Sequence, residues 1–370
     1  MEERPKLRYF DVIPDKRGFI VVDPFSISKE MFFSRESFLL LTLIDGKRTI
    51  SDIKSEFLKM TGIILSNFEI ASFINELDRN YLLYNERFFK KINEEKEKMK
   101  SLEFKEIKIN NRLKELTKFL KDKNLEITKK IKGMIIPHID IFVAKETYQK
   151  VFAFLKNVRE KVIVIFGVPH FWFEIPFSLF PKNFKVEEKI IETDINFLEK
   201  IKEKFDYDIT SDYFSFKREH SIEFPLIFIS FLEEDKKVLA FLVSESNKEK
   251  LREIAKKLLE VIKEFEGEFF FISSIDLSHV GKKFGDEKSF DPEEIDIKYI
   301  DYLLNLENEK AFDFLEKNEN ITKIDGKNTN FLFLEILKNL DIKRGTLIDY
   351  KKYYEELTDS LVSYSLIVFE

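Results

Sequence analysis

A dense apolar run near residue 270 ends abruptly in polar residues, and this feature limits the possible folds more than any other. The run Phe269-Phe270-Phe271-Ile272 is too apolar for a strand with one solvent-facing side, so it predicts a strand buried on both faces. The segment from Ser273 to Gly281 follows directly and contains Asp276 and His279. Ligand sites are usually built where buried strands end, so we expect a site here.

Similar apolar runs alternate with helical patterns from Gly133 onward. The predicted strands are Met134–Ile136, Val162–Phe166, Leu226–Phe231, Val238–Val243, Phe269–Ile272 and Val362–Phe369. Between two of these strands, apolar residues from Leu251 to Phe265 are spaced for one buried face of a helix. The alternation predicts an α/β domain over residues 133–370, with a mixed or mostly parallel sheet flanked by helices.

The first 92 residues predict a small domain of their own. Its expected elements are a strand at Gly18–Val22, a helix at Arg35–Leu43, a helix whose N-cap is Ser51 and a third helix at Asn67–Asn80. Residues 93–132 carry the densest charge in the chain and predict a solvated, helical linker.

Composition narrows the classes of function. The 370 residues include 62 basic and 68 acidic side chains, which are interspersed and give a net charge of -6. This balance argues against nucleic acid or an anionic membrane as the main partner. No signal peptide or membrane-spanning run is apparent, so we expect a cytoplasmic protein. Cysteine is absent, so any metal must be held by nitrogen and oxygen.

The four histidines form the most informative pattern. His138, His170, His220 and His279 each lie in or beside a short apolar segment. A lone histidine near a strand is more often a hydrogen-bonded core residue than a ligand. Together with the Asp325-Gly326 motif, however, the four histidine motifs are expected to meet at one rim of the sheet.

These motifs resemble the Memo family, in particular the branch named AmmeMemoRadiSam system protein B. The resemblance rests on Pro137-His138, on Gly167-Val168-Pro169-His170, on Glu219-His220-Ser221-Ile222-Glu223, on the run from Asp276 through Asp286 and on Leu361-Val362-Ser363-Tyr364-Ser365. It implies the fold of the LigB-like class III extradiol dioxygenases for roughly the last two thirds of the chain.

The resemblance also implies a metal site. Memo-like proteins bind a metal through the histidines that match His138 and His170 and through a cysteine, whose place is taken here by Asp325. Two imidazoles and one carboxylate suit a divalent metal, with Fe(II) favoured and Zn or Mn as alternatives. Asp325 in an Asp-Gly sequence is alternatively a plain turn residue.

Further roles follow from the same resemblance. His279 aligns with the acid/base histidine of the dioxygenases, and Asp276 aligns with its nearby carboxylate. A neutral imidazole suits this role because it can take a substrate proton and return it. Glu219, His220 and Glu223 are expected behind the ligands, where they hold ring tautomers. A buried polar network without a catalytic part is the alternative for these three residues.

The N-terminal region has a resemblance of its own. Its helices, with Asp45-Gly46-Lys47-Arg48-Thr49 between the first two, look like a PqqD-like, winged-helix α+β domain that recognises peptides. The strand near Phe19 to Val22 is then expected to be the sheet edge that pairs with a guest strand. A three-helix accessory domain without a ligand is the alternative.

The predicted function is metal-dependent redox or ring-opening chemistry on a small substrate, for example an aromatic diol. The family name implies a radical S-adenosylmethionine enzyme and other AmmeMemoRadiSam proteins as partners. The alternative is a non-catalytic scaffold that holds a metal or small ligand and recruits a partner through its N-terminal domain.

Overall fold

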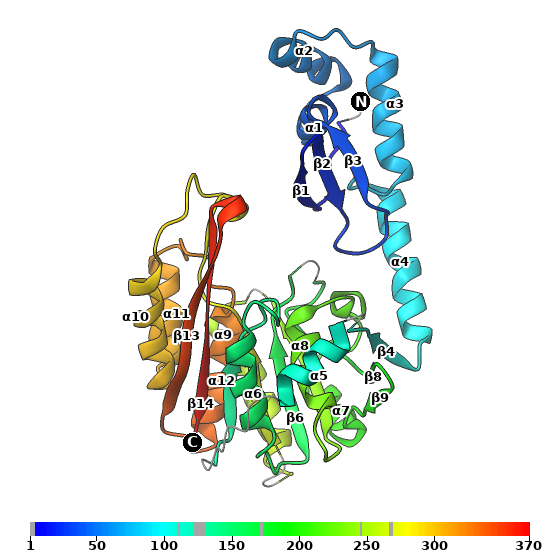
Figure 1. Ribbon diagram of the computed structural model, residues 1–370. Coiled ribbons are helices and arrows are strands. Elements are labelled where there is room, and N and C mark those ends of the chain that lie inside the picture. Colours follow the sequence, from blue (N-terminus) through cyan, green and yellow to red (C-terminus); the bar gives the residue numbers. More distant parts are fainter. Residues whose placement is uncertain (1–3, 110–111, 122–129, 171–172, 245, 266–268) are drawn as a thin grey trace. The chain divides into compact units, whose positions relative to one another are not determined.

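A computed structural model describes residues 4–109, 112–121, 130–170, 173–244, 246–265 and 269–370. The chain divides into two compact units, Met1–Ser101 and Leu102–Glu370 (Figure 1). The segment expected as a linker contributes to both. Helix α4 (Glu86–Ser101) ends the first unit, and strand β4 (Phe104–Ile107) pairs in parallel with β8 (Asn183–Val186) in the second.

The first unit combines a three-stranded antiparallel sheet with helices. Its other elements are β1 (Asp11–Asp15), β2 (Gly18–Val22), β3 (Met31–Ser34), α1 (Arg35–Thr42), α2 (Ile50–Thr61) and α3 (Asn67–Arg79). Apolar residues at helical spacing, such as Ile53 with Phe57 and Ile70 with Leu77, form its core.

Two predictions for this unit are wrong in detail. The N-cap of α2 is Thr49, whose side chain accepts the amide of Asp52 while the Asp52 carboxylate accepts the amide of Thr49. This capping box satisfies two helix-end donors, which Ser51 cannot do from inside the first turn. Strand β2 is central in the order β1-β2-β3, so Phe19–Val22 is not a free sheet edge.

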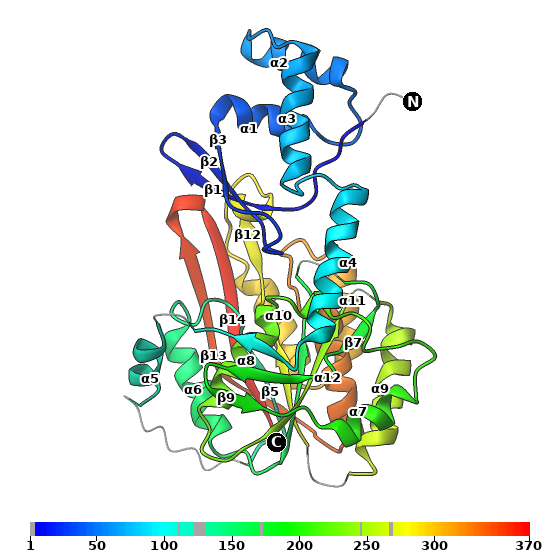
Figure 2. The same ribbon diagram turned by 90° about the vertical axis from the view of Figure 1, so that its right-hand side faces the viewer.

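The second unit is built on an eight-stranded mixed sheet in the order β12-β14-β5-β11-β6-β10-β7, with β13 also paired to β14. Strands β5, β11, β6 and β10 are mutually parallel, and their neighbours β14 and β7 run antiparallel to them. These strands are β5 (Gly133–Ile136), β6 (Val162–Gly167), β7 (Phe177–Leu179), β10 (Lys237–Val243), β11 (Phe269–Ser274), β12 (His279–Gly281), β13 (Gly345–Glu355) and β14 (Ser360–Phe369). The long β13–β14 hairpin lies at one edge of the sheet (Figures 1 and 2).

Helices cover both faces of this sheet. They are α5 (Leu113–Lys121), α6 (Lys145–Leu155), α7 (Ile195–Lys202), α8 (His220–Ser230), α9 (Lys248–Ile262), α10 (Glu293–Leu304), α11 (Asn308–Lys317) and α12 (Lys327–Asn339), while β8 and β9 (Lys189–Ile191) pair with β4 in a small separate sheet. Helices α9 and α12 pack on one face, and α6 and α8 lie over the other. The α/β class predicted from the alternation of apolar runs is confirmed.

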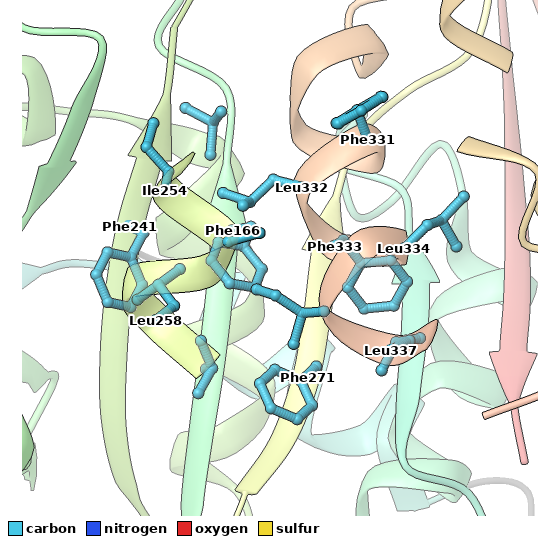
Figure 3. Packing of buried hydrophobic residues seen from close by; sticks show 14 of the residues in the cluster. Phe166, Phe241, Ile254, Leu258, Phe271, Phe331, Leu332, Phe333, Leu334 and Leu337 are labelled. Atoms are coloured by element: carbon cyan, nitrogen blue, oxygen red, sulfur yellow. The ribbon is translucent and has the colours of Figure 1, made fainter. Parts of the chain in front are cut away.

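The core shows why the central strands are apolar on both sides. Phe166 of β6, Phe241 of β10 and Phe271 of β11 point toward α9 and α12 and meet Leu258 and Leu332 (Figure 3). The intervening residues of the same strands are equally buried. Burial of both faces leaves polar residues only at the strand ends.

One predicted strand is wrong. Residues Leu226–Phe231 lie largely within helix α8, which starts at His220 and includes Pro225. The helix is buried nearly all round, so its sequence is a continuous apolar run that resembles a buried strand. As a result, His220 stands at the start of a helix and not at the end of a strand.

Candidate metal centre

The carboxyl ends of three parallel strands meet at one edge of the sheet. His138 follows β5, His170 follows β6 and Asp276 follows β11. Because β11 is hydrogen-bonded to both β5 and β6, the segments after these strands are neighbours. The sequence pattern therefore located this edge correctly.

His138 is 1% exposed, and its ring orientation is fixed. Nδ1 lies 3.1 Å from the carbonyl oxygen of Ser274, so Nδ1 carries the hydrogen and the Nε2 lone pair faces inward. The Tyr148 hydroxyl lies 2.9 Å from the carbonyl oxygens of both Pro137 and Ile139, and it holds the turn around His138 from both sides.

His170 is held by a buried carboxylate. Its backbone amide donates to Glu219 Oε2 at 2.9 Å, and its Nδ1 lies 2.8 Å from Glu219 Oε1. Glu219 is also the N-cap of α8, where it accepts the Ser221 amide. A carboxylate bound to Nδ1 leaves Nε2 as the ligand atom and increases its basicity, as is common behind metal-binding histidines.

Asp325 directly precedes α12 and reaches both rings. Its Oδ2 lies 2.9 Å from Nε2 of His138 and 3.8 Å from Nε2 of His170, while its Oδ1 accepts the amide of Asp276 at 3.1 Å. Gly326 next to it packs against Ile275 so closely that a Cβ would lie 2.8 Å from that side chain. The Asp-Gly pair is thus a packed connection that places the carboxylate.

Two atoms of this cluster lack hydrogen bonds. His138 Nε2 and Asp325 Oδ2 are fully buried, and neither has a hydrogen-bond partner among the described residues, although they face each other at 2.9 Å. Nitrogen and oxygen ligands lie about 2.0–2.2 Å from a divalent metal, which puts neighbouring ligand atoms about 3.0–3.5 Å apart. The donor set therefore suits a metal ion, and the 2.9 and 3.8 Å separations of Asp325 Oδ2 from the two Nε2 atoms lie on either side of this range.

His220 adds a third imidazole. Its ring centroid lies 4.1 Å from that of His170 and 4.9 Å from that of His138. One ligand atom from each of these three histidines lies within 4.8 Å of the others, so the three rings together can hold a metal ion. The sequence placed His220 behind the ligands, but the structure brings its ring as near as theirs.

Burial and neighbouring charges shift the pKa values of the cluster. Burial would lower the pKa of His138, but the carboxylates of Asp276 and Asp325 outweigh it and raise that pKa. Burial opposes ionisation of Glu219, yet the charge and hydrogen bond of His170 lower its pKa to about 2. Burial and the charge of His170 lower the pKa of His220 to about 3. The pKa shifts of His138 and Glu219 thus both favour positive charge on the imidazoles beside ionised carboxylates.

Asp276 and His279 have different hydrogen-bond partners, and their expected pairing stays a prediction. Asp276 is buried, and its carboxylate accepts the backbone amide of His138 at 3.0 Å. The His279 ring is instead oriented by the carbonyl oxygens of Leu277 and Lys323, at 3.0 and 3.1 Å from Nδ1. Nδ1 therefore carries the hydrogen, and Nε2 is the atom that can accept a proton.

Glu223 lies one helical turn after Glu219, and its carboxylate pairs with Lys105 of β4 at 2.6 Å. Among the described residues its carboxylate therefore contacts a lysine and not a histidine ring. Sequence reasoning missed Tyr148, whose hydroxyl supports the His138 turn. A tyrosine in an amphipathic helix has no local signal for such a role, because the contact depends on how α6 packs.

Comparison with known proteins identifies the family of this chain. The family model described as "Memo-like protein" matches residues 84–368. The chain belongs to this Memo-like family. A relative described as "MEMO1 family protein" from Aquifex aeolicus is 41% identical over 99% of this chain and 100% of its own length. The "MEMO1 family protein TTHA0924" from Thermus thermophilus is 24% identical over 87% of this chain and 99% of its own.

A solved structure, that of an uncharacterized protein from Escherichia coli K12, is more distant. It covers 65% of this chain and 99% of its own, with 13% sequence identity and a TM-score of 0.36, which is too low to bear on the fold. No helix in the described parts of the Memo-like chain is long and apolar enough to cross a membrane.

Proposed function

We propose that the protein holds one divalent metal through His138, His170 and Asp325 and uses it to transform a small substrate. The observation that carries the proposal is the pair of buried atoms without hydrogen bonds, His138 Nε2 and Asp325 Oδ2. Leaving buried polar atoms unpaired costs free energy, which a ligand between them offsets. His220 is a further imidazole available to the same ion.

The donor set favours Fe(II), with Zn and Mn as alternatives. Two imidazoles and one carboxylate typify non-haem iron sites that keep positions open for substrate, and no soft thiolate is present to select zinc or copper. Iron held by these three residues would supply a redox-active Lewis acid at the cluster. Glu219 keeps the His170 tautomer, and Asp276 keeps the backbone of His138 in place.

The proposed reaction class is oxidative, dioxygenase-like chemistry, and the first substrate candidates are small aromatic diols. His279 is the proposed acid/base. Its Nδ1 is fixed by two carbonyl oxygens, so Nε2 can take a proton from a substrate hydroxyl and return it. The resemblance to LigB-like dioxygenases, stated above from the sequence, supports this assignment.

The proposed setting is a cytoplasmic AmmeMemoRadiSam system that includes a radical S-adenosylmethionine enzyme. The first unit is proposed to be PqqD-like and to bind a peptide along β1 or β3, since β2 is internal. The support is the succession of helices and the Asp45-Gly46 turn.

A non-catalytic scaffold is the second candidate, and exposed apolar side chains favour it. Ile64 and Phe68, around the turn between α2 and α3, are 77% and 81% exposed. Apolar side chains gathered on a surface often mark contact with a partner. In this case the metal would serve structure or ligand binding without turnover.

The two candidates separate in one experiment. Protein purified without oxygen is analysed for metals and then screened for oxygen consumption with catechols. Enzymatic function predicts iron near one equivalent and substrate-dependent oxygen uptake, and His279→Ala should keep the iron but lose about 10²–10⁴-fold in rate. Full metal content with no turnover across the screen would favour the scaffold.

A further inference from the structure

A cavity of about 680 Å³ opens beside Asp325. Its walls come from the segment after β6 with Val168 and Pro169, from the end of β10 with Val243 and Ser244, and from the turn that leads into α12. Ligand pockets for small molecules typically measure about 300–1,000 Å³, so the volume is suitable. The cavity therefore touches both Asp325 and the segment that carries His170.

The inner wall and the rim of this cavity differ in chemistry. Val243, Leu315 and Ile324 are buried and apolar, whereas the carboxylates of Glu316 and Glu319 are exposed at the rim. The two lysines of the wall already have partners, since Lys323 pairs with Asp286 at 2.8 Å and Lys327 pairs with Glu316. A ligand in the cavity thus meets a mainly apolar inner wall, and both lysines of the wall are already paired.

The polar groups left for a ligand lie at the start of α12. This helix has no side-chain cap and no acidic residue in its first turn, whereas α8 and α9 are capped by Glu219 and Asn247. Its first amides therefore remain donors at the positive end of the helix dipole. Asn328 in the same turn is 8% exposed, and its Oδ1 finds no hydrogen-bond partner in the described chain.

We propose that this cavity binds a small hydroxy carboxylic acid with an apolar body. The inference rests on the proposed metal centre, because the bound ion neutralises Asp325 and leaves the inner wall favourable for an anion. The carboxylate accepts hydrogen bonds from the first amides of α12, and the hydroxyl donates to Asn328 Oδ1. The apolar body lies along Val168 and Pro169, the half-buried apolar residues of the wall.

The test uses mandelate as a probe, titrated by calorimetry into the full-length, metal-loaded protein. Phenylacetate lacks the hydroxyl and 1-phenyl-1,2-ethanediol lacks the charge, so each should bind about tenfold more weakly. The variant Asn328→Leu should bind mandelate about as weakly as phenylacetate, with phenylacetate itself unchanged. Asn339→Leu, at the exposed far end of the same helix, should bind like wild type.

Three results would overturn the proposal. If the diol binds as tightly as mandelate, the cavity does not recognise the carboxylate. If phenylacetate binds as tightly as mandelate, no group in the cavity binds the hydroxyl. A preference for mandelate that survives in Asn328→Leu would assign the hydroxyl to the metal alone. Asn328→Leu should fold, because it removes a buried polar atom without a partner, and its melting temperature should not fall below that of wild type.

A separate measurement shows whether the proposed metal centre itself is wrong. Elemental analysis tests whether the ion is present, and the same titrations are run on metal-free protein. Mandelate should bind more weakly there but keep its Asn328-dependent preference over phenylacetate, because Asn328 and not the metal accepts the hydroxyl. Loss of that preference in both forms would end the proposal even where the metal is bound.

Discussion

Two carboxylates of the second unit stand in opposite situations: Asp296 is fully buried, and Asp325 is part-buried with its Oδ2 atom buried. Asp296 on α10 accepts hydroxyl hydrogen bonds from Ser278 at 2.6 Å, Ser363 at 2.5 Å and Tyr350 at 2.9 Å. Asp325 has one hydrogen bond from the backbone of Asp276, and its other oxygen lies 2.9 Å from Nε2 of His138, which offers no donor while the ring is neutral with its hydrogen on Nδ1.

This difference indicates that the Asp296 cluster stabilises the fold and that the Asp325 cluster binds a ligand. The Asp296 network is complete within the protein, and it ties the segment before His279 to β14, since the amide of Ser278 also donates to Ser363 Oγ at 2.9 Å. A complete buried network rigidifies a fold. The Asp325 cluster is incomplete within the protein, and such a site is expected to persist where a ligand completes it.

The largest effect is expected from replacing a ligand of the incomplete cluster. Asp325→Asn and His138→Ala should each reduce metal affinity by more than about 100-fold, because the loss of a ligand exceeds the 10–100-fold typical of residues behind the ligands. Elemental analysis after dialysis measures this. Asp296→Asn and His279→Ala are the matched controls and should keep the metal. Equal metal retention in all four variants would show that the two clusters do not differ in metal binding.

A smaller effect on metal affinity is expected from Glu219, which lies behind the proposed ligand His170. Glu219→Gln should weaken metal binding by about 10–100-fold, because a neutral amide holds the Nδ1 hydrogen of His170 less strongly and makes Nε2 less basic. Glu223→Gln is the control on the same helix, since that carboxylate pairs with Lys105. Competition with a chelator gives both affinities. A similar loss in the two variants would mean that Glu219 acts only through the stability of α8.

The smallest effect is expected for Asp296, whose hydrogen bonds are complete, and it is an effect on protein stability. Asp296→Asn should lower the free energy of unfolding by about 1–3 kcal/mol, because the three hydroxyls are no longer matched. Burial raises the pKa of Asp296 above 3.8, although its hydrogen bonds oppose this.

This shift sets the sign of a pH dependence. The folded protein binds the proton of Asp296 more tightly than the unfolded chain, so the contribution of this group to stability is greatest below pH 3.8 and falls as the pH rises through its raised pKa. Denaturant titrations of metal-free wild type and Asp296→Asn across this range should show the difference decline. A difference that grows with pH would reverse the assignment.

The sequence predicted the sheet edge because strand burial has a local signature. The runs that became β5, β6 and β11 are apolar on both faces, so their polar ends stand out. Residues Leu226–Phe231 have the same signature but fold mainly as part of α8, since a fully buried helix and a buried strand are equally apolar. Strand β13 was not predicted because polar residues such as Asp349 and Lys351 interrupt its pattern.

The site could be predicted only in part. The neighbourhood of His138 and His170 follows from strand ends, but Asp325 was assigned through the family resemblance and not through any local pattern. Asn320 shows what sequence cannot reveal. Its side chain accepts the amide of Ile324 at 3.0 Å and donates to the carbonyl of the same residue at 2.7 Å, which braces the backbone just before Asp325. Such contacts depend on the path of the chain.

The most direct test of the metal centre is anomalous diffraction from crystals of the iron-loaded protein. The account predicts one peak in the second unit, about 2.0–2.3 Å from Nε2 of His138, Nε2 of His170 and Oδ2 of Asp325. A peak bound by other residues, or no peak at this cluster under saturating iron, would contradict it.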